Sequence, residues 1–113
     1  AYATIVFYDA SFMDSLASVA KPTISKFGTQ ELSNLTWAFA TLEHCDAELL
    51  QVISQQVQIK MLEFQTQHLA NIAWGFTELN GMSAHLALSL GDVCLSRVKQ
   101  FKKQELAMTL WAF

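Results

Sequence analysis

The sequence has little that would break a helix or cross a membrane: one proline and four glycines occur among 113 residues. With so few breakers and no Ser/Gly-rich tract, we expect no linker or low-complexity segment. No run approaches the ~18 consecutive apolar residues that a membrane-spanning helix needs, so membrane insertion is not expected. At 52% hydrophobic and 15% charged residues, the composition indicates one domain that folds by burial.

The residue patterns of enzymes and metal sites are also missing. We find no Ser/His/Asp arrangement, phosphate-binding glycine loop or paired carboxylates in a catalytic context. His44-Cys45-Asp46 is a ligand-like triplet, but a metal site needs three or four converging ligands. The sequence therefore predicts a binding protein with no catalytic residues, no metal and no cofactor.

What is present is an internal repeat. The stretch 27–39 returns 37 residues later at 64–76 and again at 101–113. Aligned positions include Phe27/Phe64/Phe101, Gln30/Gln67/Gln104, Leu32/Leu69/Leu106, Trp37/Trp74/Trp111 and Phe39/Phe76/Phe113. Repeats of 20 to 50 residues are typical of stacked supersecondary units that present an extended surface. Cys45 and Cys94 occupy different repeat positions, which argues against a disulfide framework.

The whole chain, 1–113, is predicted to be one helical-repeat array. We divide it into a partial repeat 1–26, full repeats 27–63 and 64–100, and a partial repeat 101–113. Residues 1–5 match 38–42, and Phe113 falls in the middle of the pattern. We therefore expect the sequence to be an excerpt of a longer chain.

Each repeat is predicted to contain two helices. Helix A is expected over about Thr29 to Leu42, with Thr29 as its N-cap, and helix B follows a cap at Asp46. The corresponding caps are Asp9 and Ser83. Buried stripes of helix B are expected at Leu49/Ile53/Val57/Met61, Leu86/Leu90/Cys94/Val98 and Phe12/Leu16/Ala20/Ile24. Pro22 is expected to end the first helix B near Ala20.

A helical wheel assigns the faces of helix A. Leu32, Leu35, Thr36 and Phe39 are predicted to face helix B, and Gln30, Asn34, Trp37 and Thr41 to lie opposite. Small residues flank these faces, at Ser33/Ala70/Ala107 and Ala38/Gly75/Ala112. Because Gly75 costs about 1 kcal/mol of helix propensity, we expect a close neighbour there. The prediction is an all-α fold, a two-layer α-solenoid of stacked helix-turn-helix repeats.

This pattern resembles that of the octotricopeptide and heptatricopeptide repeat proteins, whose signature is Phe-x-x-Gln-Glu-Leu-Ala-Asn-x-x-Trp-Ala-x-Ala-x-Leu. The first copy matches it at Phe27, Gln30, Glu31, Leu32, Asn34, Trp37, Ala38, Ala40 and Leu42. The 37-residue spacing is similar to that of the heptatricopeptide branch. The resemblance implies a protein of mitochondria or plastids that binds RNA for maturation, stability, translation or ribosome assembly, in some members with a C-terminal RAP domain.

A basic edge is predicted where each helix B ends and the next helix A begins. It gathers Lys21, Lys26, Lys60, Arg97, Lys99, Lys102 and Lys103. These cations, Lys21 apart, are candidates for RNA phosphate contacts beside the N-termini of the A helices. Equally, they could complement the dipole of helix B. Acidic residues gather at the opposite edge, at Asp9, Glu43, Asp46, Glu48 and Glu78, and the net charge is −3.

The outward face of helix A is the candidate wall for bases or a partner. Its residues are Gln30, Asn34, Trp37, Gln67, His68, Asn71, Trp74, Gln104 and Trp111. The tryptophans could stack bases, or they could form a packing ladder between repeats. Polar positions that vary between repeats, such as Glu31/His68/Glu105, are the better candidates for sequence readout.

We therefore expect binding of single-stranded or ribosomal RNA in an organelle. The alternative is a scaffold that holds proteins in a large organellar complex through the same wall.

Overall fold

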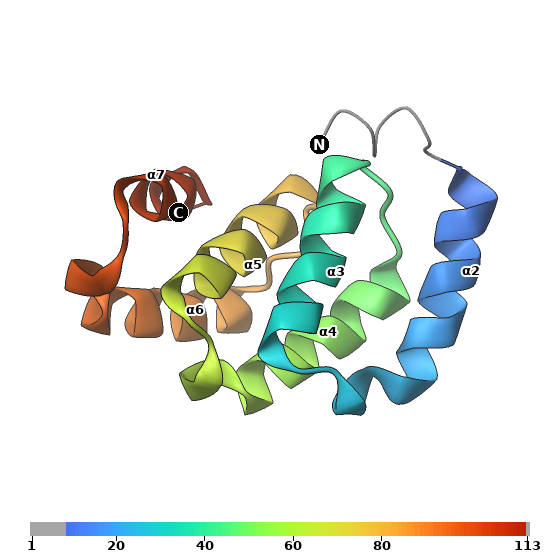
Figure 1. Cartoon of the computed structure of the whole chain (residues 1–113), viewed down its shortest axis with the longest axis horizontal. Helices are drawn as coiled ribbons and strands as arrows, with labels where there is room; N and C mark the ends of the chain where they lie inside the picture. Colours follow the sequence, from blue (N-terminus) through green and yellow to red (C-terminus); the bar gives the residue numbers. More distant parts are fainter. Residues whose placement is uncertain (1–8, 113) are drawn as a thin grey trace.

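The computed structural model describes residues 9–112, without the side chains of Leu110 and Trp111 (Figure 1). This range is all-α, with six α-helices and no β-strand. The helices are α2 (Ala10–Ala20), α3 (Thr29–Thr41), α4 (Ala47–Ile59), α5 (Thr66–Glu78), α6 (Ala84–Ser96) and α7 (Lys103–Ala112), with 3₁₀ turns η1 (Lys21–Lys26), η2 (Met61–Glu63) and η3 (Val98–Gln100). The match of residues 1–5 to a helix end, and the position of Phe113, lie outside the described residues.

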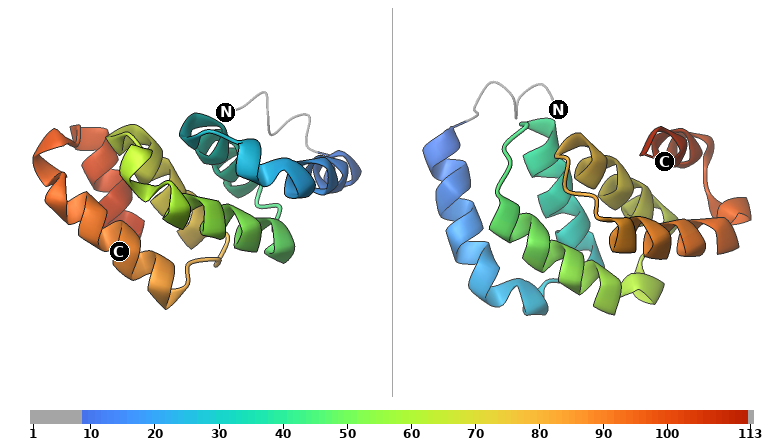
Figure 2. Two further views of the ribbon diagram at one scale, coloured as in Figure 1. Left: turned by 90° about the horizontal axis from the view of Figure 1, so that it is seen from below. Right: turned by 180° about the vertical axis from the view of Figure 1, so that it is seen from behind.

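The helices form two layers. α3, α5 and α7 pack side by side in one layer, and Figure 2 shows α2, α4 and α6 along its other side. The all-α prediction is confirmed for the described part of the chain, whereas a solenoid with this period continuing over more repeats stays a prediction.

The predicted caps of the second helix in each pair are confirmed. Asp46 Oδ1 accepts a hydrogen bond from the Leu49 amide at 3.0 Å, and Ser83 Oγ accepts one from the Leu86 amide at 3.1 Å. Asp9 caps α2 in the same way, through the amides of the first turn. Each side chain satisfies backbone donors that the helix leaves free.

Pro22 also acts as predicted. α2 ends at Ala20 after 11 residues, whereas α4 and α6 each have 13. The chain continues as η1, with the proline in its first turn, because proline lacks the amide that an α-helix would use there.

The predicted start of helix A is wrong by one residue. Gly28, in an extended conformation, is the N-cap of α3, and Thr29 is the first helical residue. The reason is the Glu31 carboxylate, which accepts a hydrogen bond from the Gly28 amide at 2.6 Å and so fixes the cap one position earlier.

The predicted end of helix A, in the loop after Leu42, is confirmed. Glu43 and Asn80 both have left-handed backbones, with φ of 53° and 56°. The next amides, of His44 and Gly81, donate back to Phe39 O at 2.9 Å and Phe76 O at 2.8 Å. This six-to-one hydrogen bond terminates α3 and α5 in the same way.

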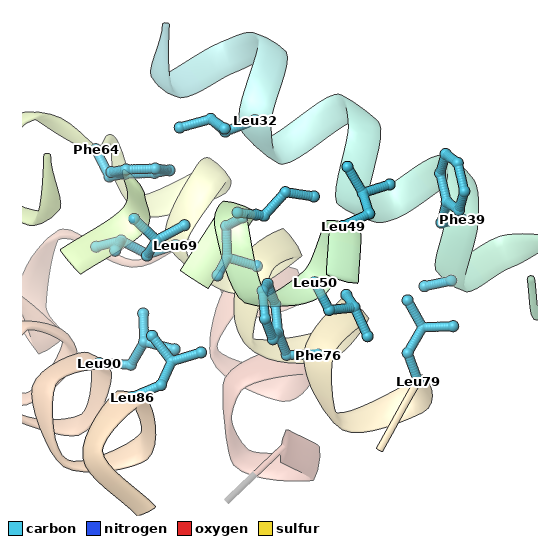
Figure 3. Close-up of a cluster of buried hydrophobic side chains, with 14 of the residues drawn as sticks. Leu32, Phe39, Leu49, Leu50, Phe64, Leu69, Phe76, Leu79, Leu86 and Leu90 are labelled. Carbon is cyan, nitrogen blue, oxygen red and sulfur yellow. The ribbon is translucent and has the colours of Figure 1, made fainter. Parts of the chain in front are cut away.

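The hydrophobic core runs between the layers (Figure 3). The predicted stripe Leu49/Ile53/Val57/Met61 is buried, as are Leu86, Leu90 and Cys94. Two members of the first stripe are wrong: Phe12 and Leu16 are 60% and 36% exposed, and α2 buries Met13 and Ala17 instead. Val98 is also exposed, at 46%. These exceptions lie at the two ends of the helix stack.

The close neighbour expected at Gly75 is α3. A Cβ added at Gly75 would lie 2.6 Å from Thr36 Cγ2 and 3.6 Å from Ala40 Cβ, so the two helices approach almost to backbone contact. Thr36 was assigned to the face toward helix B, but this methyl group lies against α5, which corrects that assignment. Ser33 and Ala70 are fully buried, as expected for small residues between neighbouring A helices.

An ion pair joins Lys21, the C-cap of α2, to Asp46, the N-cap of α4. Lys21 Nζ lies 3.1 Å from Asp46 Oδ2, so Lys21 belongs to the acidic edge and not to the predicted basic edge. Burial alone would raise the pKa of the Asp46 carboxyl, but hydrogen bonds from the Leu49 amide and Lys21 outweigh it and hold the pKa below its usual 3.8.

A glycine-to-alanine pair tests the α3–α5 contact. We expect Gly75→Ala to destabilise the protein by about 1–3 kcal/mol through overpacking, partly offset by about 1 kcal/mol of helix propensity. At Gly91, in α6, an added Cβ meets nothing within 4 Å, so Gly91→Ala should instead stabilise it by up to about 1 kcal/mol. Urea denaturation measures both. Thr36→Ser, which removes the opposing methyl group, should reduce the cost of Gly75→Ala; equal effects at both glycines would contradict the contact.

Lowering the pH should remove the contribution of Asp46 to the free energy of unfolding. Because its folded pKa is lowered, Asp46 stabilises the fold above about pH 3.8, and this contribution disappears as the pH falls through the folded pKa. Asp46→Asn keeps a capping oxygen, so the variant should be less stable than wild type at pH 6, and this difference should be smaller at pH 3. The measurement is the free energy of unfolding at both pH values, and an unchanged difference would refute the expectation.

Candidate functional site

The outward face of the A layer carries most of the predicted wall residues. Gln30, Asn34, Gln67 and Gln104 are exposed, and His68 and Asn71 are half-buried. They point outward because the remaining sides of α3 and α5 are occupied by the core and by the neighbouring A helix. The structure therefore places these polar side chains where a ligand could reach them.

Four predicted site residues meet in a hollow between α5 and α7. It measures about 210 Å³ and is lined by Gln67, Asn71, Lys102, Gln104, Glu105 and Met108. Three amide side chains can both donate and accept hydrogen bonds there, and one cation and one carboxylate lie beside them. The hollow can therefore hold a small polar group with several hydrogen-bonding edges.

A second hollow adjoins the first at the edge where α5 and α7 begin. It measures about 500 Å³, and its lining includes the 62–67 segment, Arg97 and Gln100. Gln67, Lys102 and Glu105 line both hollows. We call the two together the α5–α7 groove. It leads from the edge of the molecule onto the A-helix face.

Trp37 and Trp74 do not line this groove. Trp74 is half-buried and packs against the hydrophobic core, as a packing ladder requires. Trp37 is half-buried as well. The side chain of Trp111 lies outside the described residues.

Two of the predicted phosphate-binding cations have structural partners. Lys60 Nζ donates to Ser25 O at 3.0 Å and to Phe27 O at 2.5 Å. Arg97, the equivalent residue one repeat later, donates to Leu62 O at 2.8 Å and to Phe64 O. Both side chains tie the end of one helix B to the preceding interhelical segment. We call these two interactions the backbone clamps.

The other predicted cations remain accessible. Lys26, Lys99, Lys102 and Lys103 are exposed, and Lys102 lines the α5–α7 groove with the half-buried Arg97. The basic edge therefore keeps charge available to a ligand, with Lys102 nearest to the wall residues.

The Glu31/His68/Glu105 position, predicted for sequence readout, has a structural role in two copies. Glu105 is 8% exposed and its Oε1 accepts from the Lys102 amide at 3.0 Å and from Thr66 Oγ1 at 2.9 Å. It therefore caps α7 and also joins α7 to α5. In the middle copy His68 takes this position, and its buried Nδ1 finds no hydrogen-bond partner among the described residues.

The sequence analysis predicted neither the cap formed by Glu105 nor the backbone clamps. The signal for the cap was available, because a glutamate three residues after the N-cap is a capping-box signature. The backbone clamps had no such signal, since they depend on which carbonyls the fold leaves free beside Lys60 and Arg97.

The described part of the chain adds two observations on ligands and membranes. Within it, no three His, Cys, Asp or Glu side chains come together as a possible metal site. None of its helices is long and apolar enough to cross a membrane. Cys45 and Cys94 are free cysteines, and burial raises the pKa of the Cys94 thiol.

Comparison with known protein families, curated proteins and solved structures finds no match to this chain.

Substituting the clamp residues should lower stability. Lys60→Met and Arg97→Met each remove a charged donor from two backbone carbonyl groups, one of them partly buried in each case, which we expect to cost about 1.5–3 kcal/mol. Lys99→Met, at an exposed cation, should change the free energy of unfolding by no more than about 0.5 kcal/mol. Guanidinium denaturation compares the three variants, and equal stabilities would show that the clamps contribute nothing.

Proposed function

We propose that this chain is part of an α-solenoid of stacked 37-residue helix hairpins that binds single-stranded RNA. The equivalent caps, helix ends and backbone clamps support the solenoid, because each device recurs at the same position of successive repeats. A solenoid of this kind offers a polymer one equivalent surface after another.

The observation that carries RNA binding is the α5–α7 groove. Gln67, Asn71 and Gln104 supply amide groups on the A-helix face, and such groups suit the hydrogen-bonding edges of unpaired bases. At the edge, Lys102 and Arg97 supply the positive charge that phosphates require. A nucleotide would place its base on the wall and its phosphate at the edge.

Glu105 does not prevent this arrangement. Its carboxylate lies in the groove, but the oxygen Oε1 is already engaged by the Lys102 amide and the Thr66 hydroxyl. These donors partly offset its negative charge. Three exposed lysines also lie close to Glu105 in the sequence: Lys99, Lys102 and Lys103.

The setting we propose is a mitochondrion or a plastid, in RNA processing, stability, translation or ribosome assembly. It is supported by the resemblance of the repeat signature to octotricopeptide and heptatricopeptide repeats. The proposed role is binding without catalysis.

A scaffold for protein partners is the second candidate. It is favoured by large apolar side chains on the surface of the helix B layer, since Ile59, Leu88 and Leu95 are each at least 70% exposed. Exposed apolar side chains of this size are typical of protein contact surfaces.

Binding to fluorescently labelled single-stranded RNA tests the proposal. Anisotropy titrations with the four homopolymers, at 50 and 200 mM salt, should show affinity that falls steeply with salt. Lys102→Ala should weaken binding to every homopolymer and lower the salt slope by about 1. Gln67→Ala should weaken binding about fivefold, to a degree that depends on the base, because it removes roughly 1 kcal/mol of hydrogen bonding.

Gln55→Ala is the matched control, because this exposed glutamine belongs to helix B and lines a hollow near the opposite edge. It should leave every affinity unchanged. Absence of RNA binding at 50 mM salt would refute the proposal, and salt-insensitive binding to a protein partner would favour the scaffold.

A further inference from the structure

A third hollow lies between α4 and the loop that joins α5 to α6. It measures about 340 Å³ and shares no lining residue with the α5–α7 groove. Leu50 and Leu79, both drawn in Figure 3 and each 7% exposed, give it an apolar floor. The polar side chains that line it are uncharged: Cys45, Gln51, Ser54, Gln55, Asn80 and Ser83. A hollow of this size and composition is typical of small-ligand sites.

At the equivalent place one repeat earlier, the chain fills the space with its own imidazole ring. His44 lies in the loop after α3 and reaches α2, where its Nε2 is 2.8 Å from Asp14 Oδ1. The ring also packs edge-on against Phe39, with the ring centroids 5.7 Å apart. The His44 side chain is only 11% exposed, so the junction between this loop and α2 encloses it.

The next junction has the same backbone but lacks the ring. The Gly81 amide donates to Phe76 O at 2.8 Å, as the His44 amide donates to Phe39 O at 2.9 Å. Gly81 and Gln51 both line the hollow. The equivalent pairs are His44/Gly81, Asp14/Gln51 and Phe39/Phe76. The hollow therefore lies where the first junction holds an imidazole, and a glutamine amide replaces the carboxylate that contacts it there.

The walls of this hollow are complete within the described residues. α4 packs against η1, α3 and α6, and the loop joins α5 and α6, which pack against each other. The hollow is thus an internal feature of two successive hairpins.

We propose that this hollow binds an uncharged imidazole ring that comes from outside the chain. Leu50 and Leu79 contact the ring, and the Gln51 amide hydrogen-bonds one of its nitrogens, since an amide can donate or accept. An amide does not stabilise a positive ring as the Asp14 carboxylate would, so the neutral form is the one that fits. The ring belongs either to a small molecule or to a histidine side chain of a partner. This site does not rest on RNA binding.

Amide chemical-shift mapping by NMR tests the site with imidazole itself, at about pH 8, where the ring is uncharged. The amide signals of Gln51, Asn80 and Gly81 should shift saturably, with a dissociation constant of about 1–10 mM, as expected for one small ring. Dimethylimidazolium carries a fixed positive charge and no available nitrogen. It should bind at least about tenfold more weakly, because the lining offers no carboxylate to pair with its charge.

Gln51→Ala should weaken imidazole binding about fivefold, because a ring nitrogen loses its hydrogen-bond partner. The Gln51 side chain is exposed, so the variant should fold as wild type does. Gln56→Ala is the matched control, since this glutamine lies in the same helix but does not line the hollow. It should leave the dissociation constant unchanged.

A triple variant closes the hollow from within. Leu50→Met/Gln51→Asp/Gly81→His gives the second junction the residues of the first: Met13, Asp14 and His44. Leu50 is included because a Cβ added at Gly81 would lie 2.8 Å from Leu50 Cδ1. The variant should keep the helical circular dichroism signal of wild type and no longer bind imidazole. If it does not fold, Gln51→Ala still tests the site.

A blocked glycine-histidine-glycine peptide distinguishes the two sources of the ring. Binding as tight as that of imidazole indicates a partner's histidine, and binding of imidazole alone indicates a small molecule; both support the site. The proposal is overturned if imidazole causes no saturable shift up to about 100 mM, far above the expected dissociation constant. It is also overturned if dimethylimidazolium binds equally well, if Gln51→Ala has no effect, or if the folded triple variant still binds imidazole.

Discussion

The approach of α3 to α5 at Gly75 is the contact on which the rest of the structure depends. With no side chain at Gly75, the Thr36 methyl group and Ala40 can lie against the backbone of α5. This close spacing packs α3 directly against α5, and α5 packs in turn against α7, so the A helices form one layer and the other sides of each helix are left for the core and for solvent. A larger residue at that position would push α3 away from α5, and the two hairpins to which these helices belong would move apart.

Polar interactions then fix how successive hairpins sit relative to each other. The backbone clamps of Lys60 and Arg97 use carbonyl groups that the 3₁₀ turns and extended segments leave without helical partners. Glu105 adds a link from α7 to Thr66 at the start of α5. Part of the positive charge at the basic edge thus stabilises the stack, and the exposed lysines remain for a ligand.

The proposed functions follow from this division of surfaces. The A-helix face is polar and hollowed between α5 and α7, which suits the bases and phosphates of a nucleic acid. The helix B layer exposes large apolar side chains such as Ile59, Leu88 and Leu95, which suit a protein partner.

Local rules predicted the local structure. Asp46 and Ser83 cap helices, and Pro22 ends one, because a cap or a proline acts on backbone groups within four residues along the chain. Gly75 also gave a local signal, because the cost of glycine in a helix indicated that a neighbouring helix lies close to it. The one-residue error at Thr29 arose because the Glu31 carboxylate competed for the cap, and that signal was also local.

What only the tertiary structure decided is the use of each surface residue. The sequence placed Lys60, Arg97 and Lys102 in one basic group, but the fold gives the first two backbone carbonyl partners and leaves Lys102 in the α5–α7 groove. Phe12 and Leu16 fit the buried stripe by spacing, yet they are exposed because burial requires a neighbouring element, which periodicity cannot supply. Spacing along the chain determines which side of a helix a residue occupies, and the packing of helices distant in sequence determines what that side meets.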